Sequence, residues 1–203
     1  MSEMQSRGRT SVQMLAEAGV LIALAKVLDM IVLFKGINGG SVTLAAMAPI
    51  FIFSIRWGVK WGVLAGAVFG LLQMLLGGYI VHPLQAILDY PLAFAMLGFC
   101  ALPKGRGHHE FKYYIPSTLF AIFLRFVCHF LSGIIFYGSV DFTKGGASLM
   151  DALNPANLFN WGSISYSVTY NLGYLLPDAL ICLVVLALLW KPLNTLLIPQ
   201  YKN

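Results

Sequence analysis

Three polar side chains that could do chemistry stand inside apolar stretches of this sequence. Asp89 lies in QAILDYPLAF, and Arg125 and His129 lie one helical turn apart in RFVCHFLSGIIFYG. Inside a bilayer each ionisable group costs at least ~2.5–3.5 kcal/mol on insertion scales, so it needs a partner or a function. A carboxylate, a permanent cation and an imidazole can bind a polar ligand, relay protons or take part in catalysis.

The positions of these groups along the predicted helices place them at similar depth. Measured from the expected outer ends of their segments, Asp89 lies ~9 Å deep, His129 ~15 Å and Arg125 ~21 Å. In the last apolar segment, Tyr166 lies ~6 Å deep and Asn171 ~13 Å deep by the same helical rise. Polar groups from three helices are therefore predicted to converge in the outer half of the membrane, which favours a pocket over unrelated structural pairs.

Helical periodicity adds neighbours to this cluster. In the fifth segment one helix face carries Arg125, His129, Gly133 and Tyr137. In the sixth segment one face carries Ser163, Ser167 and Asn171, and the neighbouring face carries Tyr166 and Tyr170. In the alternative interpretation, the hydroxyls satisfy helix carbonyls and the tyrosines form an interfacial belt. As a set they predict an outward-facing pocket for a small, flat, heteroaromatic and cationic ligand, because rings stack and a carboxylate balances charge.

The composition is that of a membrane protein. Of 203 residues, 59% are hydrophobic and only 10% are charged, whereas soluble domains carry roughly a quarter charged residues. The net charge of +5 does not predict nucleic-acid binding, because no basic stripe with interleaved aromatics occurs. The cysteines Cys100, Cys128 and Cys182 lack metal-ligand spacing, so neither a metal site nor a cofactor is expected.

Six apolar segments are candidates for membrane-spanning helices, which need about 20 apolar residues each. They are residues 12–34, 42–56, 58–77, 83–102, 114–139 and 163–190. The first is too long for a signal peptide, and the whole chain, 1–203, is predicted to be a single all-α integral membrane domain. Glycines at every fourth position of the third segment, Gly58, Gly62, Gly66 and Gly70, predict close packing against another helix.

The distribution of basic residues predicts the orientation. With six spans, both termini share a side with the 56–60 turn and the 103–113 loop, and that side holds nine of the 13 basic residues. The opposite side holds only Lys35 and Lys144. Basic residues accumulate on the cytoplasmic side, so both termini are predicted to be cytoplasmic.

At these residues the sequence resembles a known family. The strings GGSVTLAAMAPI, QAILDYPLAF, RFVCHFLSGIIFYG and YSVTYNLGYLLPD are similar to those of the thiamine-specific substrate-binding subunits (S-components, the ThiT/YuaJ family) of bacterial energy-coupling-factor (ECF) transporters. The resemblance covers most of residues 12–190. It implies a six-helix S-component in the plasma membrane, a pocket that opens outward to bind thiamine, and a lid between the first two spans.

The resemblance also implies site residues. Those that match family positions for the substrate are Tyr79, Asp89, Tyr90, His129, Gly133, Ser163, Tyr166 and Asn171. Two further pocket positions depart from the pattern: Arg125 stands where the family has lysine, and Tyr137 where it has tryptophan. The lid sequence FKGINGGS has neither tryptophan nor acid, so no contact is carried over there.

The resemblance further implies partners for uptake. The chain has no GxxxxGK[ST] phosphate loop, so it cannot hydrolyse ATP in that manner. The family's partners are a transmembrane coupling subunit and two ATPases, and the expected docking surface is the small face of the first span at Ala16, Gly19 and Ala23. Alternatives are an S-component for another vitamin or a thiamine precursor, and a solitary proton-coupled carrier. An intramembrane enzyme is disfavoured, because neither HExxH nor GxSxG occurs.

Overall fold

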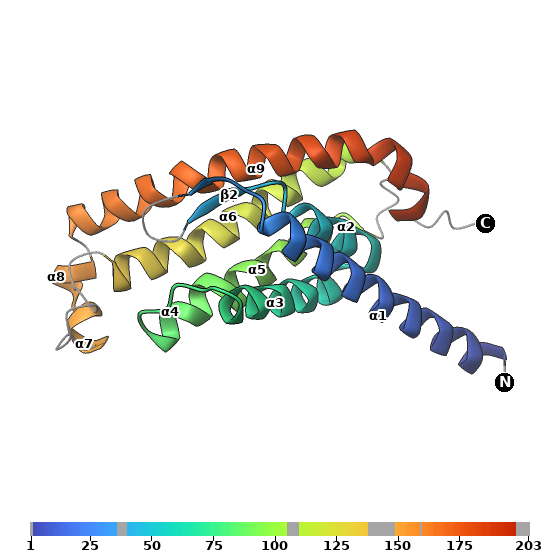
Figure 1. Ribbon diagram of the computed structural model, residues 1–203, viewed down its shortest axis with the longest axis horizontal. Helices are drawn as coiled ribbons and strands as arrows, with labels where there is room; N and C mark the ends of the chain where they lie inside the picture. Colours follow the sequence, from blue (N-terminus) through green and yellow to red (C-terminus); the bar gives the residue numbers. More distant parts are fainter. Residues whose placement is uncertain (1, 36–39, 105–109, 138–148, 159, 198–203) are drawn as a thin grey trace.

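The computed structural model describes residues 2–35, 40–104, 110–137, 149–158 and 160–197, and most of these residues are helical (Figure 1). The main helices, in chain order, are α1 (Ser2–Asp29), α2 (Ala48–Trp57), α3 (Val59–Leu75), α6 (Phe111–Phe136) and α9 (Trp161–Leu197). Two short helices, α7 (Leu149–Ala152) and α8 (Pro155–Leu158), lie between α6 and α9 in the chain. The N-terminal end of α1 and the C-terminal end of α9 lie at one end of the molecule, and α4 (Pro83–Ile87), α7 and α8 lie at the other.

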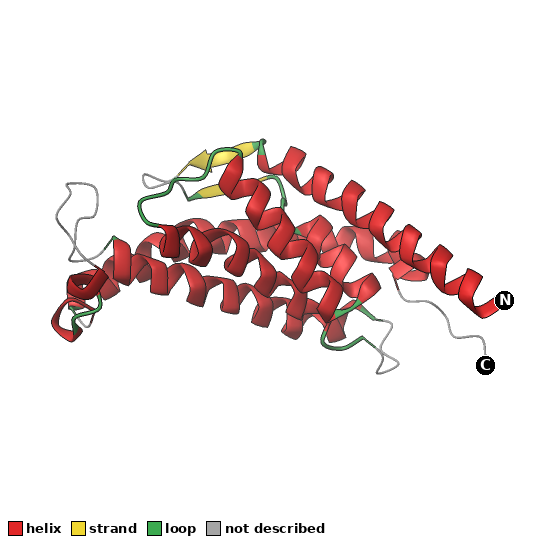
Figure 2. Ribbon diagram, turned by 90° about the horizontal axis from the view of Figure 1, so that it is seen from below, coloured by secondary structure: helices red, strands yellow, loops and turns green. Residues whose placement is uncertain are grey.

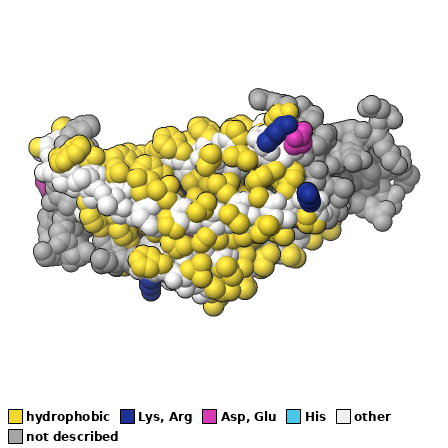
Figure 3. All heavy atoms as spheres, turned by 90° about the horizontal axis from the view of Figure 1, so that it is seen from above, with side chains coloured by type: hydrophobic (Ala, Val, Ile, Leu, Met, Phe, Trp, Pro, Cys, Tyr) yellow, Lys and Arg dark blue, Asp and Glu magenta, His cyan; other side chains and the backbone are white. Residues whose placement is uncertain are grey.

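Each of the six predicted segments contains helix. Four helical stretches of the described residues are long and apolar enough to cross a membrane: Ser11–Asp29, Pro83–Ala101, Phe111–Phe136 and Trp161–Pro192. The helices α2 and α3 are apolar but shorter. The face seen in Figure 3 is covered almost entirely by hydrophobic side chains, with few charges among them. A surface of this kind fits the apolar interior of a bilayer.

The prediction for the end of the first span is wrong. Helix α1 ends at Asp29, and the chain continues into β1 (Val32–Lys35), which pairs antiparallel with β2 (Ser41–Thr43). Figure 2 shows this hairpin beside the C-terminal end of α1. Hydropathy does not distinguish a short apolar strand from a helix end. The hairpin also takes the first residues of the predicted second span, so α2 begins only at Ala48.

The fourth segment changes its helical geometry along its length. It consists of α4 (Pro83–Ile87), the π-helix η1 (Leu88–Leu92), α5 (Ala93–Ala95) and the 3-10 helix η2 (Met96–Ala101). Pro91 lies inside η1, and a proline removes one backbone donor and clashes with the preceding turn. The wider π-turn accommodates this disruption, and it is the turn that carries Asp89.

The glycine ridge of α3 packs against this fourth segment. A Cβ added at Gly66 would lie 2.8 Å from the carbonyl carbon of Phe94, and one at Gly70 would lie 2.8 Å from Cα of Pro91. These close approaches confirm the predicted helix packing for Gly62, Gly66 and Gly70. Gly58 has a different role, because its φ of 95° forms the turn between α2 and α3.

Candidate functional site

A cavity of about 340 Å³ lies among α1, the hairpin, α3, the fourth segment, α6 and α9. Its volume falls within the roughly 300–1,000 Å³ typical of small-molecule sites. Nine of the ten residues predicted for substrate binding line it: Tyr79, Asp89, Tyr90, Arg125, His129, Gly133, Tyr137, Tyr166 and Asn171. The predicted convergence of polar groups from separate helices is therefore present in the structure.

Asp89 is held by donors from its own helix and from α6. Gln85 Nε2 and Ser132 Oγ each donate to Asp89 Oδ2 at 2.7 Å, and His129 Nδ1 lies 3.0 Å from Asp89 Oδ1. Gln85 also donates to the Tyr79 carbonyl and accepts from the Val81 amide. The arrangement fixes the position of this carboxylate at the cavity wall.

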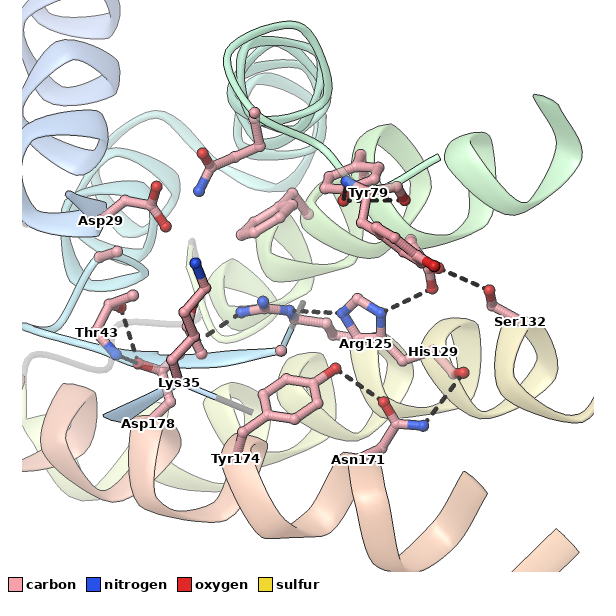
Figure 4. Close-up of a pocket in the computed structure, with 18 of the residues that line it drawn as sticks. Asp29, Lys35, Thr43, Tyr79, Arg125, His129, Ser132, Asn171, Tyr174 and Asp178 are labelled. Carbon is pink, nitrogen blue, oxygen red and sulfur yellow. Dashed lines mark hydrogen bonds and ion pairs between the residues drawn. The ribbon is translucent and has the colours of Figure 1, made fainter. Parts of the chain in front are cut away.

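Arg125 continues this network to the other side of the cavity, as Figure 4 shows. Its Nε donates to His129 Nε2 at 3.2 Å, and its Nη1 lies 3.9 Å from Asp178 Oδ2 on α9. The other oxygen of Asp178 accepts from both the amide and the hydroxyl of Thr43 at 3.0 Å. Strand β2, α9, α6 and η1 are thus joined by one chain of polar contacts.

Stacked tyrosines form two further parts of the wall. The rings of Tyr79 and Tyr137 stack with centroids 6.3 Å apart and planes 28° apart. On α9, Tyr166 and Tyr170 stack at 5.7 Å with planes 7° apart. The hydroxyl of Tyr170 accepts a hydrogen bond from the Gly40 amide at 2.7 Å, so the second pair also contacts the hairpin loop. Such faces can stack on a planar ligand.

Two of the residues predicted for substrate binding, Gly133 and Ser163, lie where α6 and α9 pack together. A Cβ at Gly133 would lie 2.9 Å from Cβ of Ser167, so this glycine lets α6 and α9 approach closely although it also borders the cavity. Ser163 is buried in α9 at 3% exposure but is outside the cavity lining. The face that Ser163 shares with Asn171 is turned partly toward α6, where Asn171 Nδ2 donates to the His129 carbonyl at 3.3 Å.

The cavity also contains residues that the sequence did not place in a site. They include Lys26, Asp29, Gln73, Gln85, Ser132, Tyr174 and Asp178. Lys26 and Asp29 form an ion pair there, with their charged atoms 3.0 Å apart. The amide oxygen of Gln73 also accepts from Lys26. A signal for Gln85 exists in the sequence, since it precedes Asp89 by one helical turn.

The small face of α1 is open. Ala16, Gly19 and Ala23 are all exposed, and a Cβ at Gly19 would meet nothing within 4 Å. Their neighbour Glu17 faces the bundle instead, with its Oε2 2.6 Å from Arg56 Nε. Ala25 is fully buried, so it does not belong to the open face.

The described part of the chain shows no gathering of metal ligands. No group of three or more His, Cys, Asp or Glu side chains is placed to hold a metal ion among these residues. Cys100, Cys128 and Cys182 are buried free thiols.

Comparison with known proteins gives consistent matches. Residues 15–150 match a family model described as thiamine transporter protein (Thia_YuaJ). The thiamine transporter ThiT of Bacillus subtilis (strain 168) is 34% identical, over 90% of this chain and 93% of the relative. ThiT of Lacticaseibacillus paracasei (strain ATCC 334) is 29% identical, over 61% of this chain and 67% of the relative. A solved structure of ThiT from Listeria monocytogenes superposes with a TM-score of 0.72 at 25% identity, covering 94% of this chain and all of that one.

Proposed function

Because the chain belongs to the Thia_YuaJ family of thiamine transporters, a family of multi-pass bacterial membrane proteins, we propose that its cavity binds thiamine for uptake into the cell. Thiamine joins an aminopyrimidine ring to a positively charged thiazolium ring that bears a hydroxyethyl group. A site for it needs a negative charge, aromatic faces and hydrogen-bonding groups in a cavity of drug-like size. The cavity described above supplies all of these.

The charge balance of the cavity carries the proposal. Its described lining contains three carboxylates and three cations: Asp29, Asp89, Asp178, Lys26, Lys35 and Arg125. Lys26 is paired with Asp29, and Arg125 lies beside Asp178. Asp89 has no lysine or arginine partner among the described residues; its donors are an amide, a hydroxyl and an imidazole. The third cation, Lys35, forms no ion pair with Asp89, so a ligand cation is the natural counterion for this carboxylate.

The remaining lining residues suit the rings of the ligand. We assign the stacked pairs Tyr79–Tyr137 and Tyr166–Tyr170 to contacts with the faces of the two rings. Tyr90, His129 and Asn171 border the same space and can address ring edges by hydrogen bonds. We assign no ligand contact to Ser163, because it is outside the lining.

Two measurements test this function. Mass spectrometry of the small molecules that copurify with the protein should find thiamine. Detection of a different vitamin or of a thiamine precursor instead would show that the proposed substrate is wrong. Calorimetric titration of ligand-free protein should show one thiamine per chain. Calorimetry is preferable to tryptophan fluorescence, because Trp57, Trp61, Trp161 and Trp190 are all outside the cavity lining.

Uptake against a gradient requires an energy source, which we assign to the partners of an ECF module. The transmembrane coupling subunit would contact the open face of Ala16, Gly19 and Ala23, and two ATPases would complete the complex. The proposed six-span orientation, with both termini cytoplasmic, puts the α2–α3 turn with Arg56 and Lys60 on the same side as the termini, as the positive-inside rule requires.

The docking face is tested by adding bulk to it. Gly19→Trp or Ala23→Trp should abolish thiamine uptake by cells while purified protein still binds thiamine, because the cavity is untouched. Leu188→Trp on α9, where the side chain is 73% exposed, serves as the control and should leave uptake intact. Normal uptake by the α1 variants would exclude this face as the docking surface.

A solitary proton-coupled carrier gains no support from the polar chain of the cavity. Arg125 stands in the middle of it, between His129 and Asp178, and a guanidinium does not release its proton in proteins. Purified protein in vesicles should therefore fail to accumulate thiamine in response to a pH gradient. Accumulation under these conditions would identify it as a carrier that needs no ATPase.

A further inference from the structure

His129 has a partner at each of its two ring nitrogens. Nε2 lies 3.2 Å from Nε of Arg125, and Nδ1 lies 3.0 Å from Oδ1 of Asp89. A guanidinium has only N–H donors and no acceptor. Nε2 must therefore present its lone pair to Arg125, and the single ring proton of the neutral imidazole must be on Nδ1, where it is donated to Asp89.

Building on the proposed thiamine function, we propose that Arg125 is a positioning residue: it holds His129 in the neutral Nδ1–H tautomer, so that the carboxylate of Asp89 keeps its full charge for the cationic ring of the ligand. An imidazolium at this position would form an ion pair with Asp89. That pair would have no net charge and would attract a cation far less. Arg125 thus contributes to ligand affinity without touching the ligand.

The surroundings of Arg125 fix it in this role. Its guanidinium lies 4.2 Å from the ring centroid of Phe94 and 3.9 Å from Asp178, and it is 7% exposed. Asp178 is in turn held by the two hydrogen bonds from Thr43. The guanidinium therefore cannot turn away from Nε2 without leaving the Asp178 carboxylate in a buried position with no cation, which is costly.

Charged and titratable groups from every neighbouring element bear on this arrangement. The charged groups that face His129 or share its cavity are Asp89 on η1, Arg125 on α6, Asp178 on α9, Lys35 on β1, and Lys26 and Asp29 on α1. The tyrosines that share the cavity are Tyr79, Tyr90, Tyr137, Tyr166, Tyr170 and Tyr174. A proton added to Nε2 would point at the guanidinium of Arg125. It would place two cations side by side, and the proton would have no acceptor. In the wild-type protein the geometry therefore offers no acceptor for a second ring proton at Nε2.

The test compares Arg125→Met with Arg125→Lys. Methionine keeps much of the side-chain length but leaves Nε2 free to accept a proton, and lysine restores a group that can only donate. Thiamine affinity is measured by calorimetry between about pH 8 and about pH 6, on either side of the ordinary histidine titration. Because the ligand is the same in all three proteins, the readout is the ratio of variant to wild-type affinity at each pH.

We expect the ratio for Arg125→Met to fall by about fourfold across this range, because an ordinary histidine is almost entirely neutral at about pH 8 and about one quarter neutral at about pH 6. The ratio for Arg125→Lys should stay level. A neutral thiophene isostere of thiamine should bind Arg125→Met equally well throughout, since it carries no charge for Asp89 to attract. If Arg125→Met does not fold, Arg125→Met combined with Asp178→Asn removes the carboxylate left without a cation and is used instead.

A second measurement needs no ligand. Nitrogen NMR of protein with labelled histidines, with His129→Gln to assign the signals among the four histidines, should show Nδ1 protonated and Nε2 unprotonated at about pH 6.5. A protonated Nε2, or parallel pH profiles for wild type and Arg125→Met, overturns the inference while thiamine binding stands. Wild-type protein that binds no thiamine at about pH 8 overturns the proposed function instead.

Discussion

Two halves of the helix bundle use the same helices in opposite ways. In the packed half, α2, α3 and η2 meet through glycines and fully buried apolar side chains such as Phe51, Phe69 and Leu97. In the cavity half, the same α3 and the same fourth segment border a cavity through polar side chains such as Gln73, Gln85 and Asp89. The difference indicates a division of labour, in which close packing fixes the backbone and the cavity holds charge in place for a ligand.

The largest expected effect is in the cavity half. Asp89→Asn should weaken thiamine binding by about 30-fold or more, since loss of one member of a buried charge pair costs about 2–5 kcal/mol. The unfolding midpoint should also fall, because the asparagine oxygen can accept from Gln85 and Ser132 while its amide nitrogen then faces the Nδ1–H of His129. Calorimetric titration measures the affinity.

Glu110→Gln makes the same change of charge at an exposed site paired with Lys112 and should bind thiamine as the wild type does. Wild-type affinity in Asp89→Asn would remove Asp89 from the site and would end the contrast between the two halves.

The next largest effect is expected in the packed half, where a substitution should lower stability without lowering thiamine affinity. Gly66→Ala places a Cβ against the backbone carbonyl of Phe94, and overpacking of this kind costs about 1–3 kcal/mol. Thermal unfolding in detergent should show a midpoint lower by about 2–12 °C. Protein that remains folded at low temperature should retain most of its thiamine affinity.

Gly173→Ala in α9 is the matched control, because an added Cβ there meets nothing within 4 Å. It should leave the midpoint unchanged or raise it, since alanine is the better helix former. If the two substitutions lowered the unfolding midpoint equally, the close approach of the backbones at Gly66 would not be the cause of the destabilisation.

The smallest effect is expected from Tyr137, and it tests whether this ring stacks on the ligand. Tyr137→Leu removes the ring that stacks on Tyr79 and leaves an apolar side chain in its place. Aromatic pairs contribute about 0.5–1.5 kcal/mol beyond their buried area, so thiamine affinity should fall by about 2- to 12-fold in a titration. Tyr137→Phe keeps the ring and should lose less. A loss as large as that of Asp89→Asn would point to a direct hydrogen bond from the hydroxyl.

Part of the cavity lining could be predicted from the sequence, for a reason that lies in helical geometry. A fixed rise of 1.5 Å per residue converts position in an apolar segment into depth, so Asp89, His129 and Asn171 could be placed at one level before any fold was known. The pairing of Asp89 with Gln85 and Ser132 was not predicted. Those two side chains are uncharged, and polar uncharged residues in a membrane helix have several ordinary uses.

The sequence by itself predicts which segments are apolar enough to enter the membrane, because the free energy of transfer into lipid follows from the residues of each segment. Only the tertiary structure decided how each helix is rotated about its axis. That rotation turns Ser163 away from the cavity, sets Gly133 against Ser167, and brings Asp178 between Thr43 and Arg125. It is decided by packing against neighbouring helices and by the hairpin, which are contacts between segments far apart in the chain, and no local pattern of residues encodes them.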